Sequence, residues 1–413
     1  MALPFFRLRE TSIPISDIER KTFRLDCFRF IFQGFIDAEF KTYVLLIAIR
    51  VFNLSDQAKG LFSAAAHIGL IMVPLALKFF TEIYPLKNNH TIALLLLFVA
   101  LNIAIATWTD QGMIFLLCIV LARILYKLTI PFVTDIYNRN YPKVRRGQII
   151  GILFTILSLS GTVLSLFVGK MFDNDLSSYR LVLWLTVIST LICGCVFLKM
   201  PNGHILSKPS TSFFRSNLSI LLNDKLFSFI LFLWSLMGIA FQMIFPLRME
   251  YIANACYGIN LSNTDITTLT VGIPAVIRIF SGFFWGKIFD TQNLAFVKIL
   301  INCCYLVSIP MFFFTENFSL LAISSIILGL GYTGNLTAWQ LWVTKVAPSS
   351  DKLGAYVGID MMVTGLRDTF SASLGYYLLS QSISLHTICI IGTILIAIST
   401  VGFTFLINNP RLR

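Results

Sequence analysis

Long apolar runs, separated by short polar segments, follow one another along most of the chain. Each run is about 20 residues long, which is the length that a helix needs to cross the hydrocarbon core of a bilayer. The pattern predicts twelve helices, over residues 27–49, 59–80, 91–109, 112–134, 149–171, 179–198, 226–247, 264–286, 295–315, 319–343, 354–379 and 385–407. No long stretch alternates apolar and polar residues with a period of two, which argues against a membrane β-barrel.

The polar segments divide these helices into two sets of six. The longest segment, residues 200–225, is rich in proline, glycine and serine, as linkers are. We therefore expect an all-α membrane protein with a cytoplasmic tail (1–26), a first six-helix half (27–199), this linker, a second six-helix half (226–407) and a C-terminal tail (408–413). The first tail lacks the apolar core of a signal peptide, so the first helix should remain uncleaved.

A short repeat supports the division into halves. Residues 145–152 (Arg-Arg-Gly-Gln-Ile-Ile-Gly-Ile) return as residues 352–359 (Lys-Leu-Gly-Ala-Tyr-Val-Gly-Ile), half a chain length later. Each copy has a basic residue, two glycines four positions apart and then an apolar run. Because each half has an even number of helices, both halves enter the membrane from the same side, as a parallel repeat. Such repeats are typical of secondary transporters, whose substrate site lies between the halves.

Composition and charge agree with a membrane protein. Hydrophobic residues make up 56% of the chain and charged residues 13%, which is too apolar for a soluble protein of this size. With both termini in the cytoplasm, the loops carry 21 Lys and Arg residues inside, counting Lys298, against 5 outside, counting Lys59. This asymmetry obeys the positive-inside rule, so the net charge of +12 needs no nucleic-acid partner. Short loops favour a plasma membrane, specifically a bacterial inner membrane.

On these features the chain resembles the major facilitator superfamily. The resemblance rests on the 6+6 layout with a central cytoplasmic loop, on the basic-glycine segment before the fifth helix, on Asp135 with Arg139 after the fourth helix, and on residues 278–290 (Arg-Ile-Phe-Ser-Gly-Phe-Phe-Trp-Gly-Lys-Ile-Phe-Asp). It implies a twelve-helix transporter whose first, fourth, seventh and tenth helices line a central cavity.

The resemblance also implies roles within residues 278–290. Gly282 and Gly286 should allow close helix contact, Asp290 should begin a helix, and Arg278 should take part in the conformational change.

The chain departs from the family pattern in its first half. Pro74, Lys78 and Glu82 stand where the matching segment has Gly, Gly and Asp. The fifth helix lacks the Gly-Pro pair of drug–proton antiporters, and the first helix lacks the acidic-plus-Arg signature of peptide–proton symporters.

Ionisable residues inside the predicted helices are the best indicators of function, because each is costly in a bilayer. In the first helix Arg29, Gln33, Asp37 and Lys41 recur every four residues and share a face. Asp37 is either a proton carrier or one member of an ion pair with Lys41 or Arg29. Glu39 points to the opposite side, where we expect it to pair with another helix.

The fourth helix carries Arg123 and Lys127 on one face. These two residues either clamp a phosphate or carboxylate of a substrate, or balance the charge of Asp37.

The eleventh helix carries Asp360, Arg367 and Asp368. Asp360 and Arg367 are two turns apart and share a face, so we expect either a gating ion pair between helices or a static pair.

Weaker polar candidates are His67, Gln242, Asn335, Trp339 and Gln340. A lone histidine in a membrane helix is more often a packing or hydrogen-bonding residue than a proton relay. For Gln242 and Asn335 the alternative is interhelical hydrogen bonding. The expected substrate contacts are Arg29, Gln33, Arg123, Lys127, Gln242, Asn335, Trp339 and Gln340. The expected gating residues are Lys41, Arg278, Gly282, Gly286, Asp290, Asp360, Arg367 and Asp368. Basic residues outnumber acidic ones inside the helices, which favours an anionic substrate.

We predict a secondary active transporter that moves a small organic anion by alternating access, in symport with protons through Asp37. The expected partners are the small-molecule substrate, protons and the lipid bilayer, and we expect a monomer. Residues 329–334 match G-x-G-x-x-G but lie inside a predicted helix with no strand before it, so no dinucleotide site follows. With no catalytic motif, no C-x-x-C spacing and no metal motif, we expect no enzyme activity, cofactor or metal.

Two alternatives stay open at this point. One is efflux of amphiphilic compounds or lipids, for which the 38 phenylalanines could line a cavity. The other is a membrane sensor or scaffold of the same fold that transports nothing, which the altered first-half signature would fit.

Overall fold

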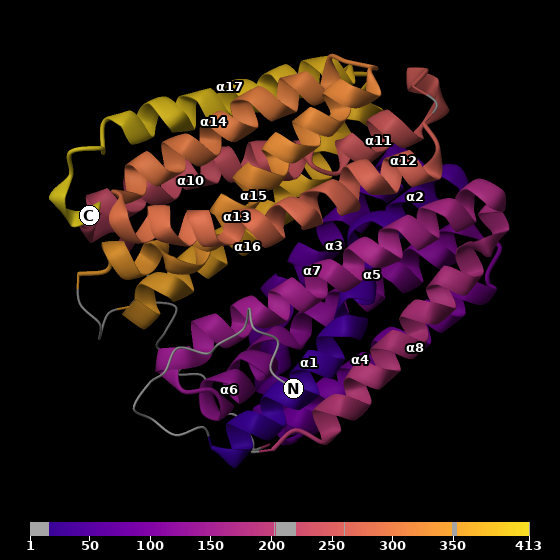
Figure 1. The fold of residues 1–413 in the computed structure, drawn as a ribbon, viewed down its shortest axis with the longest axis horizontal. Coiled ribbons are helices and arrows are strands. Elements are labelled where there is room, and N and C mark those ends of the chain that lie inside the picture. Colours follow the sequence, from indigo (N-terminus) through magenta and orange to yellow (C-terminus); the bar gives the residue numbers. More distant parts are fainter. Residues whose placement is uncertain (1–15, 202, 204–219, 260, 349–352, 413) are drawn as a thin grey trace.

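The computed structural model describes residues 16–201, 203, 220–259, 261–348 and 353–412, and these residues form an all-helical protein (Figure 1). The first half begins with α1 (Asp17–Ala38), which continues through the π-helical η1 (Glu39–Tyr43) into α2 (Val44–Arg50). It goes on with α3 (Asp56–Lys78) and η2 (Phe79–Ile83), α4 (Asn88–Trp108), α5 (Gly112–Leu128) and α6 (Ile130–Asn140), α7 (Lys143–Asn174) and α8 (Tyr179–Leu198). The predicted helices of this half are all present.

The second half repeats this plan. It contains α10 (Lys225–Ile244) with α11 (Leu247–Ala253), α12 (Asn263–Thr267) with η5 (Thr268–Gly272) and α13 (Ile273–Thr291), α14 (Leu294–Phe313), α15 (Phe318–Val346), α16 (Leu353–Ser380) and α17 (Leu385–Thr404). Ten helices among the described residues are long and apolar enough to cross a membrane. The two remaining rods are α1–α2, which carries more charged residues than any other rod, and α16. Lys352, at the start of the second repeat copy, lies outside the described residues.

The first helix begins earlier than its hydropathy predicts. Ser16 caps α1 by accepting a hydrogen bond from the backbone N–H of Glu19 at 3.1 Å, and Asp17 lies in the first turn. The carboxylate of Glu19 then receives two hydrogen bonds from Arg145 of α7, at 3.0 and 2.7 Å, in a fully buried pair. The predicted tail of residues 1–26 is therefore wrong over its last ten positions, which belong to the first helix.

The two halves meet along a few helices. In the first half α1 packs against α7 and α8, and α4 packs against α5 and α8; in the second half α14 packs against α15 and α17. Between the halves α3 packs against α16, α7 against α12, η5 and α13, and α2 against α11. Figure 1 shows the halves converging at the end that carries α2, α11 and α12, and diverging towards α6. The structure is therefore asymmetric between its two ends.

The contact of α1 with α7 depends on Gly34. A Cβ atom added at Gly34 would lie 2.7 Å from the carbonyl oxygen of Leu157 and 3.1 Å from the amide nitrogen of Gly161, which are both backbone atoms of α7. We expect Gly34→Leu to force these helices apart and to cost about 1–3 kcal/mol. Gly147→Leu is the matched control, since a Cβ there would meet nothing within 4 Å. Thermal unfolding in detergent should show a lower midpoint for the first variant only, and equal midpoints would contradict this packing.

The C-terminus is held to the start of α10 by Asp224. Its carboxylate accepts hydrogen bonds from the Arg411 guanidinium at 3.0 Å, the Tyr356 hydroxyl at 2.7 Å and the backbone N–H of Phe227 at 3.1 Å. Burial alone would raise the pKa of Asp224, but these donors, Arg411 first, outweigh it and hold the pKa below its usual range. The ionised carboxylate therefore stabilises the fold.

This stabilisation should depend on pH. Because the pKa of Asp224 is lower in the folded state than in the unfolded state, its contribution is present at neutral pH and is lost as the pH falls through the folded-state pKa. We expect Asp224→Asn to unfold at a lower temperature than the wild type at pH 7, and the two midpoints to converge in acid. A constant difference between the midpoints across this range would contradict the role of the ionised carboxylate.

Candidate substrate site and the contacts between the halves

The centre of the molecule contains an ion pair on the first helix. The Nζ atom of Lys41 lies 2.7 Å from Oδ2 of Asp37, one helical turn away. The two side chains are 42% and 31% exposed, although both residues belong to a membrane-spanning rod. Of the interpretations predicted for Asp37, the ion pair with Lys41 is therefore the one that this conformation contains.

Three more cations surround this pair. Lys127 on α5 and Arg278 on α13 both interact electrostatically with Asp37, and Arg123 interacts with Lys127. The structure gives Lys127 no hydrogen bond and no ion pair with any described residue. We call Asp37, Lys41, Arg123, Lys127 and Arg278 the central cluster. It holds four cations and one carboxylate.

The two arginines of the central cluster are held by neutral groups. Arg123 donates to the backbone carbonyl of Phe62 at 2.7 Å, and its guanidinium lies 4.1 Å from the centre of the Phe62 ring. The guanidinium of Arg278 lies 5.5 Å from the centre of the Tyr332 ring, and its buried Nε has no hydrogen-bond partner. Neither arginine has a carboxylate partner among the described residues, so the cluster keeps an unbalanced positive charge.

A polar network connects the two halves next to this cluster. His67 of α3 lies 3.2 Å from Nε2 of Gln242 on α10 and 3.7 Å from Oδ2 of Asp368 on α16, and Gln242 donates to the same oxygen at 3.3 Å. Lys127 and Arg123 act electrostatically on His67. The structure therefore brings Gln242 and His67 to the edge of the central cluster.

Arg367 forms no ion pair with another helix among the described residues. Arg367 binds its own neighbour, Asp368, with a nitrogen–oxygen distance of 2.7 Å, because its side chain turns towards α10 and contacts Gly238 there. Asp360 is 2% exposed, and its Oδ1 accepts no hydrogen bond. The network across the halves thus uses Asp368.

Two predicted substrate contacts lie in a different cluster. Arg29 donates to Asp26 at 2.9 and 3.0 Å, to Gln33 at 2.8 Å and to the hydroxyl of Tyr137 at 2.5 Å, and Tyr141 donates to the other oxygen of Asp26 at 2.6 Å. Arg29 and Asp26 are both buried. The structure does not bring Arg29 and Gln33 to the central cluster, since Asp26, which was assigned to the tail, satisfies the arginine.

In the second half, Asn335 binds Lys298, which the charge count had assigned to a cytoplasmic loop. Lys298 is fully buried in α14, where its Nζ donates to Asn335 at 3.0 Å and lies 3.8 Å from the centre of the Trp234 ring. Because Lys298 lies inside the predicted helix 295–315, its position in the sequence was the signal that should have identified it as a charge within the membrane. Trp339 has a buried indole N–H without a partner, and the side chain of Gln340 lies outside the described part of the chain.

The glycines of residues 278–290 are not packed as expected. A Cβ atom added at Gly282 or Gly286 would meet nothing within 4 Å, so in this conformation neither allows a close helix contact. Asp290 lies in the last turn of α13, and α14 is capped instead by Asn293, which accepts from the backbone N–H of Ala295 at 2.7 Å. Both expectations are wrong for this conformation.

Direct polar bonds hold the halves together at the end that carries α2 and α11. Lys59 of α3 lies 2.8 Å from Glu250 of α11, and both side chains are nearly fully buried. Asp173 of α7 accepts from the backbone N–H groups of Asn263, at 2.5 Å, and Thr264, at 3.0 Å. The sequence offered no signal for these pairs, because the partners are far apart along the chain.

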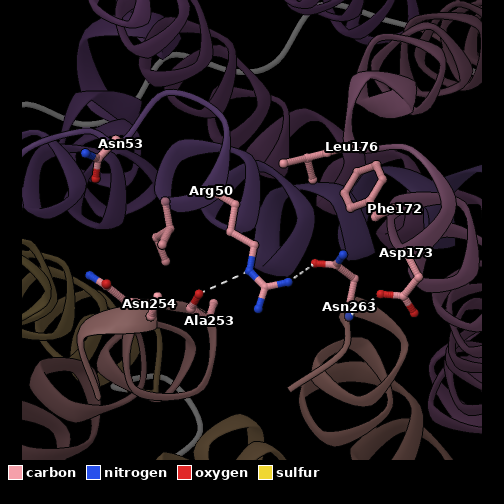
Figure 2. A pocket seen from close by; sticks show the side chains of 10 residues that line it. Arg50, Asn53, Phe172, Asp173, Leu176, Ala253, Asn254 and Asn263 are labelled. Carbon is pink, nitrogen blue, oxygen red and sulfur yellow. Dashed lines mark hydrogen bonds between the residues drawn. The ribbon is translucent and has the colours of Figure 1, made fainter. Parts of the chain in front are cut away.

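Arg50 completes this closed end. Its guanidinium donates to the carbonyl oxygen of Ala253 at 3.1 Å and to the side chain of Asn263 (Figure 2). It also donates to the carbonyl oxygen of Leu261 at 3.0 Å, so a residue of the first half binds three groups of the second. The pocket in Figure 2, of about 650 Å³, lies over these bonds, with Asp173 on its rim. Because Arg50 is already satisfied, this pocket is a surface feature of the closed end.

Comparison with known proteins gives a family match. The model described as Major Facilitator Superfamily matches residues 30–366. Similar solved structures include the nucleoside transporter NupG (13% identity, TM-score 0.73, covering 95% of this chain and 100% of that one) and a D-xylose–proton symporter (13%, 0.68, 93% and 97%). A third is a bacterial homologue of the human lysosomal transporter Spinster in an inward-facing, occupied conformation (13%, 0.66, 94% and 97%). No curated protein sequence matches the chain. At such identities the structural similarities show a shared fold alone.

Proposed function

The chain belongs to the major facilitator superfamily, and we propose that this transporter moves a small organic anion. The observation that carries the proposal is the composition of the central cluster, in which four cations surround the single carboxylate of Asp37. A cation inside a membrane-spanning bundle is costly unless an anion or water offsets its charge. A carboxylate or phosphate bound beside Lys127 and Arg123 would supply that charge, and guanidinium groups suit both anions.

The same geometry supports coupling through Asp37. In this conformation Lys41 is the ion-pair partner of Asp37. An anionic substrate would compete for Lys41, and Asp37 without its partner would gain affinity for a proton. Proton and anion would then bind together, which is symport.

Lys127→Gln is the sharpest test of the anion proposal. A ligand that binds only the folded state raises its unfolding temperature by mass action. We expect monocarboxylates, dicarboxylates or sugar phosphates to stabilise the wild type, and Lys127→Gln to weaken that binding by about 10- to 100-fold, as for a lost charged hydrogen bond.

The matched control for this test is Lys78→Gln, which removes an exposed lysine outside the central cluster. The control should bind anions like the wild type. Equal anion binding by Lys127→Gln and the wild type would contradict the proposal. Stabilisation by cationic amphiphiles alone would favour efflux instead.

The conformation also supports alternating access. With the termini in the cytoplasm, as the loop charges predict, the end closed by Arg50, Lys59 and Asp173 faces outside, so this state would be open to the cytoplasm. Near the closed end α7 runs antiparallel to the rod formed by η5 and α13. Gly272, the last residue of η5, faces Ser165 of α7 there, since a Cβ atom added at Gly272 would lie 3.6 Å from Oγ of Ser165.

The pairing of Ser165 with Gly272, continued towards the other end of both rods, predicts which residues meet in the opposite conformation. Fourteen residues along each helix away from the closed end lead from Ser165 to Gly151 and from Gly272 to Gly286. Both of these glycines have nothing within 4 Å of an added Cβ, so both present free surface for a close approach. We propose that closing the cytoplasmic side brings Gly151 against Gly286.

Two cysteine pairs in a cysteine-free background test this motion. Ser165→Cys with Gly272→Cys should cross-link in the conformation described here, and Gly151→Cys with Gly286→Cys should cross-link only in the opposite one. We expect any condition that increases one yield to decrease the other, and cross-linking either pair to stop transport. Simultaneous full cross-linking of both pairs in one molecule would contradict alternation.

A further inference from the structure

Glu39 is a carboxyl group that the central cluster does not use. It begins the π-helical segment η1, is 0% exposed, and neither of its oxygens accepts a hydrogen bond. It forms no ion pair with another helix among the described residues. Among the described residues, the groups that act on it are the hydroxyls of Thr186, on α8, and Tyr43, one turn along its own segment.

Neither hydroxyl compensates an ionised carboxylate. The Thr186 hydroxyl donates to the carbonyl of Val182 at 3.2 Å, within its own helix. The Tyr43 hydroxyl is itself buried without a partner. No charged side chain of the described residues acts on Glu39, and no group of three or more His, Cys, Asp or Glu side chains that could hold a metal ion is present there.

A carboxylate in such a place would cost far more than a neutral carboxylic acid, because burying a charge without a partner is among the most expensive events in a protein. From this geometry we infer that Glu39 binds a proton in this conformation, at a site inside the first half that is separate from the central cluster.

The position of Glu39 relates this proton to the transport site. Glu39 and Lys41 belong to the same five-residue π-helical segment, and π-helical turns are frequent at functional sites. Loss of the proton would leave a charge that the dry packing against α8 cannot hold, so η1 would have to rearrange or admit water. Lys41 would then move relative to Asp37. This link rests on the proposed function, whereas the proton on Glu39 does not.

Infrared spectroscopy of the protein reconstituted in lipid tests the protonation directly and needs no substrate. A buried protonated carboxyl group has a C=O stretching band, separate from the bands of carboxylates, which should be present in the wild type and lost in Glu39→Gln. Asp37→Asn is the control and should retain the band. Glu39→Gln should also fold with an unchanged thermal midpoint, since glutamine is a neutral group of the same shape. A carboxyl band in Glu39→Gln that is unchanged from the wild type would overturn the inference.

A second variant keeps the test valid if Glu39→Gln does not fold. Tyr43→Phe removes a hydroxyl that has no partner, so the protein should fold and the carboxyl band should remain, shifted in frequency by the changed neighbour. Absence of the band from both the wild type and this variant would show that Glu39 is ionised and would overturn the inference.

The cysteine pairs then test the link to transport. If the proton on Glu39 influences Lys41, Glu39→Gln should change the ratio of the two cross-linking yields and remove part of its dependence on pH. An unchanged ratio, with the infrared band still lost, would leave the proton site established and refute its coupling to the conformational change.

Discussion

An ionised side chain in the middle of a bilayer costs about 2.5–3.5 kcal/mol on insertion scales, and the arrangement of this protein follows from how that cost is met. Towards one end, Arg29 is satisfied by Asp26 and by a tyrosine hydroxyl, and at the other end Lys59 is satisfied by Glu250. In the centre the cations outnumber the carboxylates, and Lys127 has no direct partner among the described residues. The unsatisfied charge lies beside the polar network of His67, Gln242 and Asp368 that connects the two halves, which is where we propose that the anion binds.

The bonds between the halves are of a kind that can be broken and made again. At the closed end they are hydrogen bonds and one ion pair, from Arg50, Lys59 and Asp173, and each also requires a precise position of the opposite half. At the open end, glycines of α7 and α13 present backbone surface that nothing covers. A rocking motion would exchange the first set of contacts for close helix packing at the second.

The first helix concentrates the chemistry of the first half. Its π-helical segment places Lys41 in the central cluster and Glu39 towards α8, so one short segment faces both a group of charges and an uncharged, fully buried environment. The carboxyl groups of Asp37 and Glu39 therefore differ in what favours their charge. Neighbouring cations favour an ionised Asp37, whereas burial without a charged partner favours a neutral Glu39. A change in the protonation of Asp37 or of Glu39 would act on the same π-helical segment, which holds Lys41 and Glu39.

The sequence by itself determined the helices, their number and their division into halves, because a span's length and hydropathy are local properties that the bilayer imposes. It also indicated Asp37, Lys41, Arg123 and Lys127, since charges in an apolar run stand out without knowledge of their neighbours. Only the tertiary structure decided which partner each charge has: Arg367 pairs with its neighbour Asp368, Lys298 with Trp234 and Asn335, and Glu39 with no charged group. The physical reason is that partners in a helical bundle come from rods far apart in the chain, and the rotation of each rod, which no local pattern specifies, selects the residues that meet.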